Sequence, residues 1–278
     1  MFIGIDQEGG AVQRLYKLSD CSASKIPNMY DVGKYEDEQL TKNVARVLAE
    51  ELRVFGINLD FAPSLDIFSN PNNTVIGKRA FSSNSDVVTK MGLAFGQSLE
   101  ENGIIPVYKH FPGHGDTNAD SHYSLPVISK SIEELNNLEL IPFQKAINAR
   151  ADIIMVGHLA LPNVTGDNIP ASLSKTIITN ILKEKMGFKG IVTTDAINMG
   201  ALTRNYSESE IYEMSINAGV DIILMPNNPV KAKQIIINLV ESGQISEKRI
   251  DESVKKIIEL KYRKIEGNYC LLYTSDAA

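Results

Sequence analysis

Six short apolar runs recur along the chain, and helical patterns fill the segments between them. The runs are nearly continuous in hydrophobicity rather than alternating, which is typical of strands covered on both faces of a sheet. We therefore predict six buried strands. They are FIGI (2–5), INLDFA (57–62), IIPVY (104–108), DIIMV (152–156), GIVTT (190–194) and DIILM (221–225).

The intervening segments carry apolar residues at the 3.6-residue spacing of an amphipathic helix. Glycines stand where four of these helices should end, as expected of helix C-caps. The glycines are Gly56, Gly103, Gly187 and Gly219. The predicted helices span 39–55, 86–102, 132–149, 175–186, 207–218, 230–242 and 250–264.

The repeated strand–helix order predicts an α/β fold with a parallel sheet and helical crossovers. Nearly every predicted strand is followed by polar or ionisable residues, and a barrel gathers such strand ends at one mouth. A doubly wound sheet would carry a glycine-rich phosphate loop, but EGGAVQ does not fit GxGxxG. We predict a (β/α)8 TIM-type barrel over residues 1–265, with six βα units visible and its first two strands expected upstream of Met1. Residues 266–278 have no helical or alternating period and are interpreted as a non-native tail.

Composition narrows the range of partners. The chain has 278 residues, a net charge of −6 and 22% charged residues, and no basic patch favours nucleic acid. Its two cysteines, Cys21 and Cys270, form no CxxC motif, so no disulfide framework or thiolate metal site is expected. No apolar run is long enough to span a bilayer. The sequence leaves the cellular compartment open.

The segment KHFPGHGDTNADSH (109–122) gathers three of the four histidines of the chain. It could be a metal site, an acid–base site or a solvated loop. His110 and His114 have the spacing of helical zinc ligands, but Pro112 and Gly113 lie between them and no HExxH motif occurs. A metal hydrolase built on His110, His114 and His122 remains an alternative, although we expect no metal.

Asp120 and His122 form a possible acid–base pair. In an extended chain, residues two apart point the same way, so the carboxylate can orient the imidazole and raise its pKa towards neutrality. The alternative is a loop histidine beside a solvated aspartate.

Asp195 ends the apolar run GIVTT, where a buried carboxylate is costly without a partner or a task. At a barrel mouth it suits a nucleophile or a cation stabiliser. The alternative is an N-cap for a helix that starts near Ala196.

Further polar residues follow the other strands. Lys109 could be a surface lysine or lie over the mouth, and Arg79 taken alone reads as a surface arginine. Arg14 could pair with Asp6 or with a ligand. His158 could be a wall residue, and Asn227 and Asn228 could be turn residues before Pro229. Taken together, these groups suit a neutral polyhydroxylated ligand, and sugar is the natural interpretation.

Five motifs occur in one order: IDQEGGAVQRL, FAPSLDI, IGKRAFS, KHFPGHGDTNADSH and VTTDAINMGA. With them the chain, from Met1 to about Lys264, resembles the β-N-acetylglucosaminidases of glycoside hydrolase family 3. The resemblance implies that Asp195 is the nucleophile, His122 the acid–base and Asp120 its partner. It implies a binding set for the N-acetylglucosamine unit, without a cofactor: Asp6, Arg14, Arg79, Lys109 and His110. Family members act on N-acetylglucosaminides, muropeptides among them, often in bacterial peptidoglycan turnover.

The resemblance predicts retaining hydrolysis of terminal β-linked N-acetylglucosamine through a covalent glycosyl-aspartate. A neutral histidine leaves the site less negative than a second carboxylate would, so phosphorolysis on the same site is a second hypothesis. A metal-dependent hydrolase and a non-catalytic sugar-binding protein are the remaining alternatives.

Overall fold

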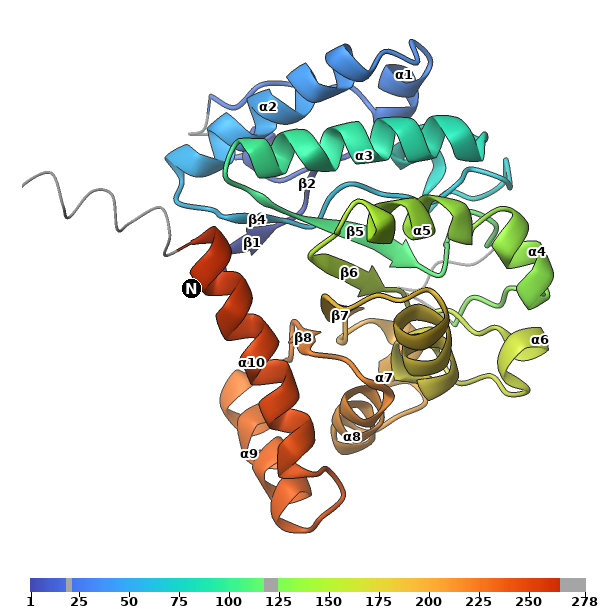
Figure 1. Cartoon of the computed structure of the whole chain (residues 1–278), viewed down its shortest axis with the longest axis vertical. Helices are drawn as coiled ribbons and strands as arrows, with labels where there is room; N and C mark the ends of the chain where they lie inside the picture. The colour runs from blue at the N-terminus through green and yellow to red at the C-terminus, as the bar shows by residue number, and fades with distance from the viewer. Residues whose placement is uncertain (19–21, 118–124, 266–278) are drawn as a thin grey trace, which may run out of the picture.

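A computed structural model describes residues 1–18, 22–117 and 125–265 of the chain, so the predicted tail lies outside the described residues. Its centre is a six-stranded sheet in which every neighbouring pair is parallel, in the order β1-β4-β5-β6-β7-β8 (Figure 1). Each strand coincides with one predicted apolar run, which confirms that prediction. The strands are β1 Gly4–Ile5, β4 Leu59–Asp60, β5 Ile105–Phe111, β6 Ile153–Val156, β7 Ile191–Ala196 and β8 Ile222–Leu224.

The sheet curls into a half-barrel and the longer helices cover its outside (Figure 1). Within the described residues, β1 and β8 are the two outer strands of the curl. The covering helices are α2 Glu38–Val54, α3 Ser85–Glu101, α4 Ile132–Asn137, α5 Leu140–Asn148, the π-type helix η4 Thr176–Lys185, α8 Glu208–Ala218 and α9 Pro229–Glu241. The last helix, α10 Glu247–Lys264, lies at the amino ends of the strands, where Lys256 binds the carbonyl oxygen of Gly190 and Arg263 pairs with Asp152. This is a partial TIM-type α/β barrel, as the sequence predicts.

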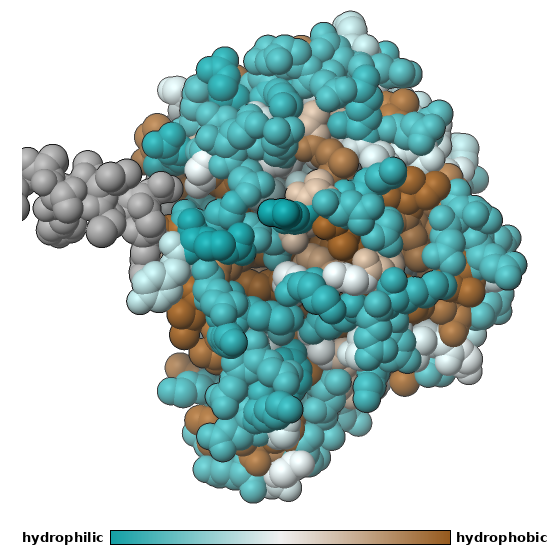
Figure 2. All heavy atoms as spheres, viewed as in Figure 1, coloured by the Kyte–Doolittle hydropathy of each residue, from teal (hydrophilic) through white to brown (hydrophobic). Residues whose placement is uncertain are grey.

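Both faces of the inner strands, β4 to β7, are largely buried, which explains why their apolar runs are continuous. One set of strand side chains packs inside the curl, including Val107, Ile153 and Ile191. Their neighbours Ile154 and Val192 pack outwards beneath the helices. Each of these inner strands is therefore apolar on both sides. The helices keep a mostly hydrophilic surface in the view of Figure 2, with apolar side chains grouped between them.

The glycines expected at helix ends have φ values of 70°, 80°, 79° and 110°, at Gly56, Gly103, Gly187 and Gly219, and so confirm those ends. One predicted helix, 132–149, is wrong as a single element because it breaks at Leu138 into α4 and α5. The break turns Glu139 inwards, where its carboxylate pairs with Lys130. A charge-stabilised turn therefore outweighs the helical periodicity.

The remaining elements are short. An antiparallel hairpin follows β1, and the sequence pattern did not predict it. It is formed by β2 (Gln7–Gly9) and β3 (Val12–Gln13). The other short helices are η1 Leu15–Lys17, α1 Met29–Gly33, η2 Gly77–Arg79, α6 Pro162–Thr165, η3 Ala171–Leu173 and α7 Gly200–Thr203. No described helix combines the length and hydrophobicity that crossing a bilayer would require.

Candidate active site

A cavity of about 300 Å³ lies at the carboxyl ends of the strands, where the barrel interpretation expects the polar side chains to meet. Six of the eight site residues that the family resemblance implies border it. Asp6, Arg14, Arg79, Lys109, His110, His114, Asp195, Asn198, Met199 and Met225 contribute to its lining. Asp120 and His122 lie outside the described residues.

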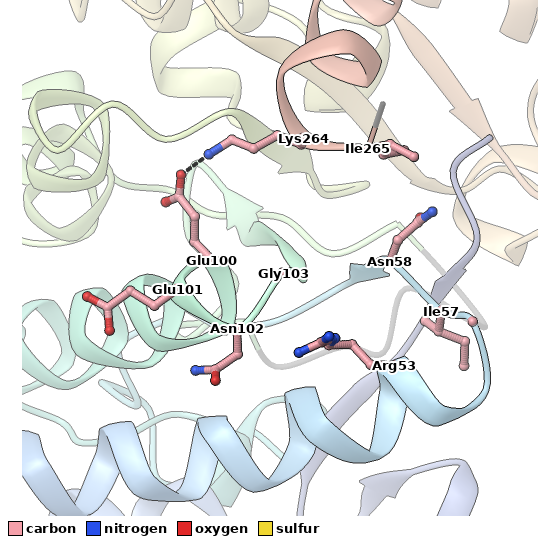
Figure 3. A pocket seen from close by; sticks show the side chains of 10 residues that line it. Arg53, Ile57, Asn58, Glu100, Glu101, Asn102, Gly103, Lys264 and Ile265 are labelled. Atoms are coloured by element: carbon pink, nitrogen blue, oxygen red, sulfur yellow. Dashed lines mark hydrogen bonds and ion pairs between the residues drawn. The ribbon is translucent and has the colours of Figure 1, made fainter. Parts of the chain in front are cut away.

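A larger cavity, of about 680 Å³, lies at the opposite end of the strands (Figure 3). It is bordered by the ends of α2, α3 and α10, and Lys264 forms an ion pair there with Glu100. The polar groups of Asn58 bind the backbone of Met1 and Ile3. Size alone would favour this cavity, but the convergent titratable groups lie in the smaller one, which is the better candidate.

Lys109 and Arg79 share a buried carboxylate that the sequence analysis did not single out, Glu8. Lys109 Nζ lies 2.6 Å from Glu8 Oε1 and 2.9 Å from Asp6 Oδ1. Arg79 binds Glu8 through two nitrogens, at 2.7 Å and 2.9 Å. The surface interpretations of Lys109 and Arg79 are therefore wrong. Lys109 is 1% exposed and both cations are held by charge pairing.

The opposite charges of Glu8, Arg79 and Lys109 stabilise one another. Burial raises the pKa of Glu8, but Arg79 and Lys109 outweigh it and hold that pKa well below its usual range. Burial likewise lowers the pKa of Arg79, and Glu8 more than restores it. All three side chains are thus charged at neutral pH, and opposite charges are paired in this part of the cavity wall.

Asp66 orders the segment after β5 and is a second residue that the sequence analysis did not assign. Its Oδ2 lies 2.6 Å from His110 Nδ1, and its Oδ1 accepts the backbone N–H of His114 at 2.6 Å. Burial raises the pKa of Asp66, but the two imidazoles and these hydrogen bonds lower it overall. The ionised carboxylate favours the tautomer of His110 with hydrogen on Nδ1, which directs Nε2 towards Arg79 at 3.4 Å.

The Gly-Pro frame around the histidines has a steric reason. Gly113 has a φ of 126°, a conformation that residues with a Cβ rarely adopt. A Cβ on Gly115 would lie 1.6 Å from the carbonyl oxygen of Ile67. The loop is therefore pressed against the segment after β4, which brings Asp66 within reach of both imidazoles.

His114 is buried, and its Nδ1 lies 2.8 Å from Thr117 Oγ1. Its ring meets that of His110 edge-on at 5.9 Å. Because each Nδ1 already has a protein partner, the two rings could bind a metal only through their Nε2 atoms. Across residues 1–18, 22–117 and 125–265 no group of three or more His, Cys, Asp or Glu side chains is placed to hold a metal ion. The third histidine of that alternative, His122, lies outside the described residues.

We expect His114 to make the free energy of unfolding smaller at acidic pH than at neutral pH. Burial, followed by repulsion from His110, lowers its pKa from 6.5 to about 4. Between pH 6.5 and pH 4 this imidazole is protonated in the unfolded chain but neutral in the native state. The free energy of unfolding therefore decreases as the pH is lowered over this range. The contribution is about 3 kcal/mol.

His114→Asn should remove most of that pH dependence, because an amide does not titrate. Urea unfolding of both proteins at pH 7 and pH 4 measures it. An equal loss of stability in the wild type and the variant would show that other groups cause the decrease.

Asp195 lies within β7 rather than at a helix start. Its Oδ1 accepts the backbone N–H of Ala196 at 2.7 Å, and α7 begins only at Gly200 with Met199 as its N-cap residue. The N-cap interpretation is therefore wrong. Burial raises its pKa, but His110, His158 and Lys109 lower it overall, so Asp195 is an ionised carboxylate at the cavity.

Two other residues considered from the sequence, His158 and Asn228, form hydrogen bonds within the protein. His158 Nδ1 lies 2.7 Å from Ser172 Oγ, and its Nε2 donates to the carbonyl oxygen of Ala196 at 3.0 Å, so it forms part of the wall beside Asp195. Asn228 is the N-cap residue of α9 and accepts the backbone N–H of Lys231 at 3.0 Å. Asn228 is therefore a helix N-cap residue with extended backbone rather than a turn residue.

Asp6 and Arg14 form the solvent-facing rim. Arg14 Nη2 lies 3.6 Å from Asp6 Oδ2, and 56% of the Arg14 side chain is exposed. The two missed carboxylates, Glu8 and Asp66, share a sequence signal with Asp6, because each closely follows a predicted strand. No sequence pattern indicated that Glu8 pairs with Arg79 and Lys109, or that Asp66 pairs with His110.

The half-barrel with its charged cavity at the carboxyl ends of the strands defines a TIM-type α/β-barrel protein. The chain belongs to glycoside hydrolase family 3, because residues 1–260 match the family's N-terminal domain.

Known relatives agree with this assignment. The beta-hexosaminidase A of Pseudoalteromonas piscicida is 36% identical over 94% of this chain and 47% of its own length. A beta-hexosaminidase of Methylobacillus flagellatus is 32% identical over 86% of this chain and 68% of its own length. A family 3 beta-N-acetylglucosaminidase structure from Paenibacillus sp. superposes with a TM-score of 0.90 at 39% identity, covering 95% of this chain and 50% of that one. The chain thus spans about half the length of the first relative and of this neighbour.

Proposed function

We propose that this protein is a retaining glycoside hydrolase that removes terminal β-linked N-acetylglucosamine. The observation that carries the proposal is the meeting of Asp195, ionised and partly buried, with Lys109, Arg79 and His110 around one cavity. The relatives named beta-hexosaminidase, and the structural neighbour named beta-N-acetylglucosaminidase, support the same class of substrate.

The reaction has two displacement steps. One oxygen of Asp195 is held by the backbone of Ala196, and the other is available to attack the anomeric carbon. The new C–O bond forms as the glycosidic C–O bond breaks, and His122, oriented by Asp120, donates a proton to the leaving oxygen. Water, deprotonated by His122, then attacks the anomeric carbon and releases Asp195 and the sugar with retained configuration.

The rest of the cavity binds the sugar. Asp6, Arg14 and Arg79 present acceptors and donors at the cavity, and Lys109 and His110 add a fixed ammonium and an imidazole nitrogen. Because Lys109 and Arg79 are compensated by Asp6 and Glu8, the site suits a neutral ligand rich in hydroxyl groups. The same charges are in place before the substrate arrives, so they need little reorganisation in the transition state.

The test is the release of nitrophenol from the aryl β-N-acetylglucosaminide and from the aryl β-glucoside. We expect cleavage of the first, with a kcat/KM at least tenfold above the second, because the site should hydrogen-bond the N-acetyl group and leave buried polar groups unpaired without it. Circular dichroism must first show that the chain is folded. Failure of a folded chain to cleave either glycoside would overturn the proposal.

A further inference from the structure

A second charged cluster lies at the amino ends of the strands, away from the candidate active site. Its centre is Asp221, whose side chain is fully buried just before β8. Asp221 Oδ2 accepts the backbone N–H of Val192 at 3.0 Å, and Oδ1 accepts the hydroxyl of Ser253 at 2.7 Å. The carboxylate is therefore held rigidly by the sheet and by α10.

Three cations surround this single carboxylate. Arg249 Nη2 and Lys256 Nζ, both from α10, each lie 3.2 Å from it, and Lys183 Nζ, from η4, lies 3.8 Å away. Arg249 also contacts a rim acid, Glu252, at 3.9 Å. One buried and one exposed carboxylate thus face three cations, so positive charge is left in excess.

The excess charge faces open space. A cavity of about 510 Å³ lies beside the cluster, bordered by Lys183, Arg249 and Lys256. Lys255 and Glu259 on its rim pair with each other at 3.9 Å and add no net charge. The three inner side chains are 14–29% exposed, partly desolvated yet within reach of a ligand.

Repulsion within the cluster lowers the pKa of Lys183. Burial lowers its pKa, Asp221 opposes that change, and Lys256 and Arg249 lower it further, to about 8. The ammonium of Lys183 still donates to the carbonyl oxygen of Gly219. An anion near Lys183 and Lys256 would relieve this repulsion and accept charge-assisted hydrogen bonds.

We propose that this cavity binds a tetrahedral oxyanion of the phosphate type between Lys183 and Lys256, with Arg249 behind it. The site is separate from the candidate active site because Asp221 precedes its strand, whereas Asp195 stands near the carboxyl end of the neighbouring strand β7. Glu252 on the rim favours a compact anion over a large acidic polymer.

Isothermal titration calorimetry with inorganic phosphate tests the proposal on the full chain at pH 7, with chloride keeping the ionic strength constant. We expect saturable binding to the wild type and at least about tenfold weaker binding to Lys183→Met and Lys256→Met. The matched controls are Lys185→Met and Lys248→Met, which remove exposed lysines from the same two helices. Arg14→Met controls for phosphate in the candidate active site. Each of these three should bind like the wild type.

Absence of binding to the wild type, or equal binding to Lys183→Met, Lys256→Met and their controls, would overturn the proposal. A second measurement does not depend on how well the variants fold. NMR of isotope-labelled lysine in the wild type should show the pKa of Lys183 rising by at least about one unit when phosphate saturates the protein. An unchanged Lys183 titration in saturating phosphate would also overturn it.

Discussion

Asp195→Asn should lower the turnover of the aryl β-N-acetylglucosaminide by at least about 10⁴-fold, as expected when a covalent nucleophile is removed. The amide has nearly the same shape but is a poor nucleophile, and it cannot stabilise positive charge at the anomeric carbon. The hydrogen bond to the backbone of Ala196 can be kept through the amide oxygen. Steady-state kinetics beside substrate binding by calorimetry separates chemistry from affinity.

Asp195→Ala supplies the control. Azide is small enough to enter the emptied space, and its attack should give the α-glycosyl azide, because one displacement inverts the configuration. Unchanged turnover in Asp195→Asn would contradict the assignment of Asp195 as the nucleophile. A folded variant that neither binds nor turns over substrate would assign Asp195 to binding instead.

Glu8→Gln should lower the free energy of unfolding by about 3–5 kcal/mol, because it removes the buried partner of Arg79 and Lys109. The volume hardly changes, so the loss reports charge rather than packing. Lys109 keeps Asp6, whereas Arg79 loses the carboxylate that binds two of its nitrogens. Activity should fall as well, since both cations border the cavity.

Glu50→Gln is the matched control for that experiment. Glu50 pairs with Arg46 at 2.9 Å on the exposed surface of α2, and such pairs contribute about 0.5 kcal/mol or less. Urea unfolding of the three proteins gives the comparison. Equal stabilities of Glu8→Gln and Glu50→Gln would show that the buried network does not stabilise the fold.

The framework of strands and helices could be predicted from the amino-acid sequence. Continuous apolar runs marked the six strands, because the inner strands β4 to β7 are largely buried on both faces. Glycines marked four helix ends because those positions have positive φ. The parallel order followed from the strand–helix repeat. Since parallel strands place their carboxyl ends at one edge, the residues after the strands could be expected to meet, and six of those singled out border one cavity.

The partners of these side chains depend on how the chain packs in three dimensions. Glu8 became the buried counterion of Arg79 and Lys109, and Asp66 became the support of His110 and His114. Such pairs join segments far apart in the sequence, so no local pattern encodes them. The cations around Asp221 have the same origin. Desolvation and pairing arise only when distant segments pack, because both depend on distances in space rather than on spacing along the chain.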